Sequence, residues 1–449
     1  MTARFVPPFP RRGMGPVAAW RGFFGERART AVYGWSELAF ETHSMQRRIL
    51  GFDVYIPLDP DEVQRVLLDN AANYAKPDIV KHLLAPTIGR GLLTADGPLW
   101  RDQRKIVAAS FAPAAVDALV TEFVRWAEAA MAEWRAGPQD MAEQCTATTM
   151  RVIAGALFGG DARLVTREAL AHIAAALEGV SEARIQAMLR LPLVPVSPKG
   201  LAAHRGQKFL RRTLTALVEE RRANGGGDDF LGRLIAALHD RFEPDEALAL
   251  AVDNAATFYL AGHETTANAL TWTLFLLSEQ PALQDQAAAE ASAALDAGPR
   301  HADWLERLPL LRRIVDESLR LYPPVPRIDR QAVASDRLGN YDVAPGDIIS
   351  VWPWLLHRHR KLWDEPDAFD AGRFDPANAA SRHRFQYVPF GGGPRMCVGA
   401  RFAMTEALVI LACWLARWRF QPCPGRQVQV SGMVTLRPKG GLPLVLSRR

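Results

Sequence analysis

The chain has 449 residues, 49% of them hydrophobic and 23% charged, with a net charge of +5 and four cysteines. This composition is that of a soluble globular protein and excludes a disordered chain. The small charge excess without a block of like charges excludes a nucleic-acid-binding tail, and four scattered cysteines exclude a disulfide framework.

The first predicted elements lie close to the N-terminus. The stretch RRILGFDVYIPLD contains the β-branched and aromatic residues typical of strands. PDEVQRVLLD then opens with proline and acidic residues, as the first turn of a helix does. The N-terminal stretch lacks the apolar core of a signal peptide, and no run of eighteen apolar residues occurs. We therefore expect no transmembrane segment and a cytoplasmic location.

The middle of the chain is predicted to be mainly helical from 97 to 322, and a further helix is expected over 400–420. The longest helical candidate without proline runs from 246 to 280. Strand patterns return towards the C-terminus. The sequence thus predicts one domain over 1–449, mainly α, with a small β subdomain from approximately 45–65, 325–352 and 426–449.

The long helical candidate contains the segment FYLAGHETTANALTW. Gly262 is a poor helix former, and Thr265 and Thr266 can bond to carbonyls one turn earlier, which predicts a local distortion. Glu264 followed by Thr265 places a proton source next to a hydroxyl that can hold a small ligand or water. The alternative interpretation is a kinked core helix with a solvated glutamate.

A second segment, LLRRIVDESLRLYPPVP, places Glu317 and Arg320 on one helix face, where they can pair. The same spacing is common in this chain and mostly indicates surface pairs. The apolar surroundings of Glu317 indicate a buried pair, which needs further partners. The other four matches are Glu26/Arg29, Glu62/Arg65, Glu122/Arg125 and Glu219/Arg222.

A third segment, PFGGGPRMCVGARFAMTEALV, places Cys397 between a glycine-rich loop and a predicted helix. Unpaired N–H groups and the helix dipole at such an N-terminus favour a thiolate, the form of cysteine that binds metals. Arg395 adds a positive charge nearby. The alternative is a buried structural cysteine beside a helix cap.

Together these segments resemble the cytochrome P-450 superfamily of haem-thiolate monooxygenases, from about residue 45 to the C-terminus. The haem-binding signature, Phe-x-x-Gly-x-Arg-x-Cys-x-Gly, matches Phe390, Gly393, Arg395, Cys397 and Gly399. The oxygen-activation motif matches Ala261, Gly262, Glu264 and Thr265. The Glu-x-x-Arg motif matches Glu317 and Arg320, and the family's further arginine, in the stretch before the haem loop, matches Arg373. The Trp-x-x-x-Arg motif matches Trp100 and Arg104.

The resemblance implies haem b, with Cys397 as the axial ligand of the haem iron. Glycines beside it would let the loop lie against the porphyrin. The resemblance also implies cationic and N–H donors for the haem propionates: Arg395, Arg104, Arg330 and Trp100. The alternative for each of these arginines is an ordinary surface position. Glu264 and Thr265 would supply and position protons.

The implied reaction inserts one oxygen atom of O2 into a C–H bond or C=C bond of a lipophilic small molecule. Electrons would come from NAD(P)H through a separate ferredoxin-type or flavodoxin-type donor and its reductase, because the stretch after Cys397 is too short for a flavin or ferredoxin domain. We expect a monomer that binds no nucleic acid. The basic residues that could dock an acidic donor are Lys105, Arg358, Arg360, Lys361 and Arg401, and the alternative is a solvated charged surface.

The resemblance implies a mainly apolar substrate pocket, lined by Pro77 to Leu93, Leu189 to Val196, Phe258, Leu260, Val325, Ile328 and the turn at Met433. Two rival functions stay open. One is a haem-thiolate peroxygenase, isomerase or dehydratase that needs no reductase, and the intact Glu264–Thr265 pair argues against it. The other is a non-enzymatic haem protein, which would leave the proton-delivery residues unexplained.

Overall fold

The computed structural model describes residues 4–13, 30–49, 52–188, 191–298, 302–432 and 434–449. The chain divides into two compact units. The first comprises Met1–Tyr74, Phe123–Thr148 and Thr265–Arg449, and the second comprises Ala75–Glu122 and Thr149–Glu264. Helices α7 (Met141–Phe158) and α11 (Pro244–Ser278) each contribute residues to both units.

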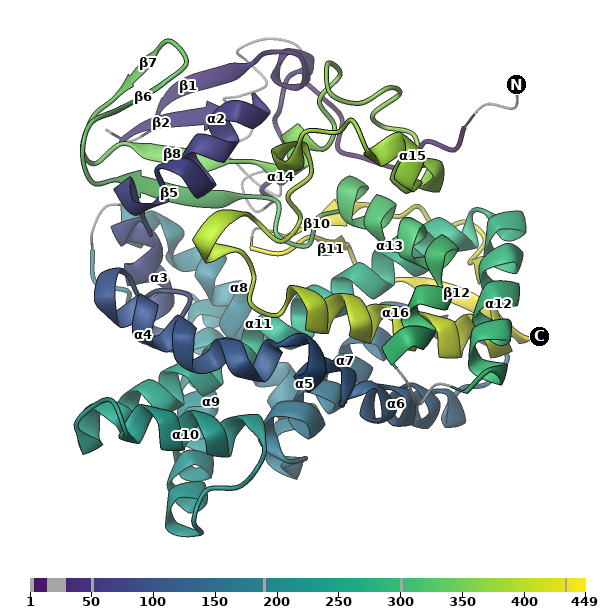
Figure 1. The fold of residues 1–449 in the computed structure, drawn as a ribbon, viewed down its shortest axis with the longest axis horizontal. Helices are drawn as coiled ribbons and strands as arrows, with labels where there is room; N and C mark the ends of the chain where they lie inside the picture. The colour runs from purple at the N-terminus through teal and green to yellow at the C-terminus, as the bar shows by residue number, and fades with distance from the viewer. Residues whose placement is uncertain (1–3, 14–29, 50–51, 189–190, 299–301, 433) are drawn as a thin grey trace. The chain divides into compact units, whose positions relative to one another are not determined.

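The largest sheet of the first unit has five strands, in the order β1-β2-β8-β5-β3. Strands β1 and β2 pair antiparallel with Met45 opposite Ile56, whereas β2 and β8 pair parallel with Val54 opposite Ile348. A core of buried apolar side chains packs against it, and α2 lies beside β2 (Figure 1). The elements are β1 (Ser44–Ile49), β2 (Phe52–Pro57), α2 (Pro60–Gln64), β3 (Tyr74–Ala75), β5 (Ile328–Ala332) and β8 (Ile348–Val351).

Helix α16 (Ala400–Arg417) is the buried centre of the helical part of this unit, and both α12 and α13 pack against it (Figure 1). Its side chains are buried continuously from Met404 to Leu415. The remaining elements are α6 (Val120–Ala132), α12 (Pro281–Asp296), α13 (Pro309–Leu321), α14 (Pro353–Leu356), α15 (Pro376–Ala379), β4 (Gly137–Asp140), β6 (Asp336–Leu338), β7 (Tyr341–Val343), β9 (Trp418–Pro422), β10 (Val430–Ser431), β11 (Arg437–Pro438) and β12 (Pro443–Arg448).

The second unit is mainly helical, and the helices that pack most closely in it are α8 and α9. Glycines allow this approach. A Cβ atom on Gly179 would lie 2.2 Å from Cβ of Ala203, and one on Gly206 would lie 2.1 Å from the carbonyl oxygen of His172. The helices of this unit are α3 (Asp78–Ile88), α4 (Gly97–Ala108), α5 (Pro113–Asp117), α8 (Arg167–Met188), α9 (Pro198–Ala223) and α10 (Phe230–His239), with parts of α6, α7 and α11.

Helix α11 is continuous over 35 residues, so Gly262 and the following threonines do not interrupt it. Packing from neighbouring elements offsets their poor helix propensity. The local distortion predicted within the helix stays a prediction. The predicted fold class, mainly α with small sheets, is confirmed. Among the described residues no single helix is long and apolar enough to cross a membrane, although one bent pair, α4 and its 3-10 turn with α5 and α6, passes by length and composition.

Candidate active site

The loop before α16 holds five of the predicted site residues, from Phe390 to Gly399. Gly393 has a φ of +64°, and a Cβ there would lie 1.8 Å from the carbonyl oxygen of Leu67, so only glycine fits. The N–H of Cys397 donates to the carbonyl of Phe390 at 2.9 Å. The loop therefore has a defined backbone shape that fixes the position of the cysteine.

Cys397 lies three residues before the first residue of α16, as the sequence predicted. Its side chain is exposed, so it is not the buried structural cysteine of the alternative interpretation. Arg395 is half-buried in the same loop. Ile328, at the start of β5, lies 3.5 Å from the position of a Cβ on Gly391. The loop and the strand that carries Arg330 are thus neighbours within the first unit.

The donor set at Cys397 indicates the kind of metal group that fits. Among the described residues no three His, Cys, Asp or Glu side chains gather to hold a metal ion. One cysteine thiolate, with the remaining iron ligands supplied by an organic cofactor, is the coordination of a haem-thiolate centre, and Cys397 can supply that thiolate. The exposed thiol and the glycine-rich backbone beside it fit a flat macrocycle.

The predicted oxygen-activation residues lie on one turn of α11. From Leu250 to Ser278 every residue of this helix is buried except Ala261, Gly262, Glu264 and Thr265. A core helix that exposes side chains over a single turn is suited to contact a bound group at that turn. The four residues that match the oxygen-activation motif are thus the same four that this part of α11 leaves unburied.

The remaining predicted haem-binding residues lie on other elements. Trp100 and Arg104 are four residues apart on α4, on one helix face, and both are half-buried. Arg330 on β5 is 4% exposed, and its guanidinium donates to the carbonyl of Asp329 at 3.0 Å. This burial excludes the alternative that Arg330 is an ordinary surface arginine.

The sequence matches the family model described as "Cytochrome P450" over residues 46–443. The chain belongs to the cytochrome P450 family. Cyclooctatin synthase from Streptomyces melanosporofaciens is 36% identical over 392 residues, covering 85% of this chain and 84% of that protein. A putative cytochrome P450 132 from Mycobacterium bovis is 29% identical over 409 residues, covering 87% of each.

Solved structures share the fold of this chain. The haem domain of cytochrome P450DA has a TM-score of 0.79 and 24% identity, covering 99% of both chains. A mutant of that haem domain has a TM-score of 0.78 and 26% identity, covering 91% of this chain and 90% of that one. The protein is therefore a P450 oxidoreductase of the haem monooxygenase class, with a haem-thiolate iron cofactor.

The predicted Glu317 network of this P450 is present and buried. The guanidinium of Arg320 donates to both carboxylate oxygens of Glu317, at 2.7 and 2.8 Å, and neither residue is exposed. Nε of Arg373 lies 3.4 Å from the same carboxylate, and the N–H of Asp370 donates to it at 2.8 Å. The Glu62/Arg65 match forms no such pair, since Glu62 accepts from Tyr55 at 2.9 Å instead.

Arg358 does not belong to the docking surface that the sequence predicted. It is fully buried, it pairs with Asp367 at 3.0 Å, and its guanidinium lies 4.3 Å from the ring centroid of Trp354. Burial lowers the pKa of Arg358 to about 10. Arg360 is exposed but pairs with Glu37 and Glu41. Lys105, Lys361 and Arg401 are exposed.

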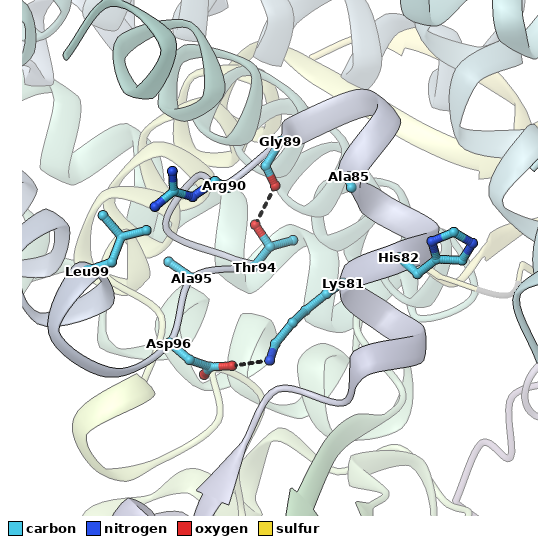
Figure 2. Close-up of a pocket in the computed structure, with 9 residues that line it drawn as sticks. All are labelled: Lys81, His82, Ala85, Gly89, Arg90, Thr94, Ala95, Asp96 and Leu99. Atoms are coloured by element: carbon cyan, nitrogen blue, oxygen red, sulfur yellow. Dashed lines mark hydrogen bonds and ion pairs between the residues drawn. The ribbon is translucent and has the colours of Figure 1, made fainter. Parts of the chain in front are cut away.

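A pocket of about 350 Å³ opens between α3 and the beginning of α4, within the predicted substrate segment 77–93 and just beyond it (Figure 2). Across it, Lys81 pairs with Asp96 at 2.7 Å and Thr94 donates to the carbonyl of Gly89 at 2.7 Å (Figure 2). Asp253 of α11 holds this loop by accepting from the N–H of Arg90 at 2.7 Å.

Other residues of the predicted substrate pocket have different environments. Phe258 and Leu260 are each 7% exposed on α11, and Val325 and Ile328 are half-buried. Leu191, Val194 and Val196 are exposed. Residues 189–190 and 433 lie outside the described residues.

Sequence analysis missed one notable group, the carboxyl of Glu406 in α16. It is fully buried, neither oxygen makes a hydrogen bond of ordinary geometry, and burial raises its pKa well above the usual range. The available signal was an acidic residue at the head of the apolar run ALVILACWLA.

Proposed function

We propose that this P450 inserts one oxygen atom of O2 into a C–H bond of a lipophilic small molecule, using electrons from separate partner proteins. The observation that carries the proposal is that Ala261, Gly262, Glu264 and Thr265 are the only residues of α11 between Leu250 and Ser278 that are not buried. These residues present an acid and a hydroxyl beside each other. Haem b held by Cys397 supplies oxygen activation, which consumes two protons and two electrons.

The protons are the part of the reaction that this chain's own side chains control. Glu264 is half-buried, so it can exchange protons with solvent and pass them inward. Thr265, the next residue, has a hydroxyl group, which can accept one hydrogen bond while it donates another. An acid next to a hydroxyl therefore forms a short proton path whose efficiency depends on geometry.

Binding of the cofactor would draw on residues already described. Arg395, Arg104 and Arg330 would bind the haem propionates through charge-assisted hydrogen bonds, and the indole N–H of Trp100 would add a neutral donor. The burial of Arg330 supports this role, because a charge-assisted hydrogen bond is weakened less by solvent at a buried site than at the surface.

The electrons are proposed to arrive from an acidic ferredoxin-type or flavodoxin-type donor that a reductase recharges from NAD(P)H. Charge complementarity supports this choice, because Lys105, Lys361 and Arg401 present basic side chains at the surface. With Arg358 buried and Arg360 paired to two glutamates, the docking charge is smaller than the sequence predicted. We expect the salt dependence of electron transfer to be modest.

A lipophilic substrate is supported by the apolar side chains Phe258 and Leu260, which lie one turn before the oxygen-activation residues of α11. A relative named cyclooctatin synthase is 36% identical to this chain. The apolar side chains near the oxygen-activation turn favour a lipophilic substrate.

The direct test is Thr265→Ala, assayed with surrogate ferredoxin and reductase as the ratio of product formed to NAD(P)H consumed. The variant should fold, bind haem and accept electrons, but it should release hydrogen peroxide, with coupling lowered about tenfold or more. Thr273→Ala is the matched control, since Thr273 is a buried threonine of α11 that donates to its own helix at 2.8 Å. Unchanged coupling in Thr265→Ala would contradict the proposal and favour a peroxide-driven enzyme or an isomerase.

A further inference from the structure

Helix α7 contacts the exposed turn of α11 through a hydroxyl group. The side chain of Thr149 donates to the backbone carbonyl of His263 at 3.0 Å, and both residues are buried. His263 lies between Gly262 and Glu264, so this hydrogen bond holds the backbone next to the proposed proton donor. Thr146 and Thr148 of the same helix instead donate to carbonyls of α7 itself, at 2.8 Å each.

One turn further along α7, Ile153 contacts the same place. A Cβ atom on Gly262 would lie 2.6 Å from Cδ1 of Ile153, which is closer than carbon atoms approach one another. Ile153 is 1% exposed, and it is four residues from Thr149 on the same helix face. The Cδ1 methyl group of Ile153 thus occupies the space that a side chain at Gly262 would need.

The ring of His263 is held as well as its carbonyl. Its Nδ1 lies 2.7 Å from the carbonyl oxygen of Tyr259, one turn earlier in α11. The hydroxyl of Tyr259 donates in turn to the carbonyl of Leu164. His263 therefore has fixed contacts on both sides, and its backbone cannot rotate without breaking at least one of them.

We propose that Thr149 and Ile153 are positioning residues for the oxygen-activation turn. They fix the carbonyl of His263 and the backbone of Gly262, and so determine where the carboxyl of Glu264 lies. A displacement of about 1 Å at a reacting group can cost on the order of 100-fold in rate. The inference rests on the proposed role of Glu264, which needs an accurate position to deliver protons.

The first experiment compares Thr149→Val, Thr149→Ser and Thr148→Val as haem-loaded proteins. Valine keeps the volume of threonine and removes its donor, while serine keeps the donor. Thr149→Val should lower the ratio of product to NAD(P)H about threefold or more. Thr149→Ser should restore it, and Thr148→Val should leave it unchanged. Haem content and unfolding temperature should match between the two valine variants.

A readout independent of turnover is the infrared C–O stretch of the reduced carbonyl complex, which responds to polar groups facing the ligand. Thr149→Val should shift or split this band, and Thr148→Val should not. Identical spectra and identical coupling in the two valine variants would overturn the inference.

The second experiment is a double-mutant cycle between Gly262 and Ile153. Gly262→Ala alone should lower coupling because its methyl group meets Cδ1 of Ile153. Ile153→Val removes that atom, so the double variant should recover much of the loss, whereas independent sites would give additive losses. Additivity would refute the proposed contact between the two helices.

The outcome of Thr265→Ala separates this inference from the proposed function. If Thr265→Ala uncouples the enzyme and Thr149→Val does not, only the positioning role fails. If Thr265→Ala leaves coupling unchanged, the function of the whole turn fails, whatever the α7 variants do.

Discussion

The carboxylate of Glu317 neutralises the positive charge of Arg320, whose side chain has no access to solvent. It binds Arg320 through two hydrogen bonds and lies 3.4 Å from Arg373. Arg320 also donates hydrogen bonds of 2.6 to 3.0 Å to the backbone carbonyls of His357, Pro366 and Ala368. Such a network is stable only when complete, because each member left alone is a buried charge without a partner.

Glu317→Ala should therefore lower the free energy of unfolding by about 3–5 kcal/mol, since Arg320 would keep its charge in a buried site. The yield of haem-loaded protein and the urea midpoint measure this loss. Glu219→Ala is the control, because Glu219 and Arg222 have the same spacing but are exposed on α9. Equal stability of the two variants would show that the Glu317 network contributes no more than a surface pair.

At the level of elements, helix α16 combines an apolar body with one buried carboxyl group. Burial raises the pKa of Glu406 well above its usual range. The folded protein therefore binds more protons than the unfolded chain between the ordinary pKa of glutamate and this raised pKa. The contribution of Glu406 to stability is fully present below the ordinary pKa and is lost as the pH rises towards the folded-state value.

Glu406→Gln should remove that pH dependence, because glutamine stays neutral. The variant should unfold at a higher temperature than the wild type at about pH 8, and the difference should shrink at about pH 5. Thermal unfolding of both proteins at the two pH values measures this difference in unfolding temperature. The control is Glu143→Gln, because Glu143 is an exposed residue of α7. A difference that grows towards acidic pH would contradict a neutral carboxyl in the folded state.

The helices also show where sequence reasoning ends. The start of α16 and the length of α11 follow from local patterns, namely proline and glycine positions and apolar spacing. The contact between Thr149 and His263 joins residues 114 positions apart, so no local pattern predicts it. The same holds for the close approach of Ile153 to Gly262, which depends on how two helices pack and not on the residues beside that glycine.

Over the whole molecule, the family motifs were predictable because each depends on a short stretch of chain. Phe390 to Gly399 form one loop, and Ala261 to Thr265 form one turn. The burial of Arg358 was not predictable, since it depends on Asp367 and on aromatic rings such as Trp354. Charge counted along a sequence overestimates a docking surface when some of that charge is buried.

The central claim for the molecule is that Cys397 is the thiolate ligand of a haem iron. The most direct measurement is the absorbance spectrum of the purified, dithionite-reduced protein under carbon monoxide. The wild type should give the red-shifted Soret band of a thiolate-ligated carbonyl complex. Cys423→Ala, at a half-buried cysteine elsewhere in the chain, should keep that band, and Cys397→His should bind haem without it. A thiolate-type band that persists in Cys397→His would contradict the account.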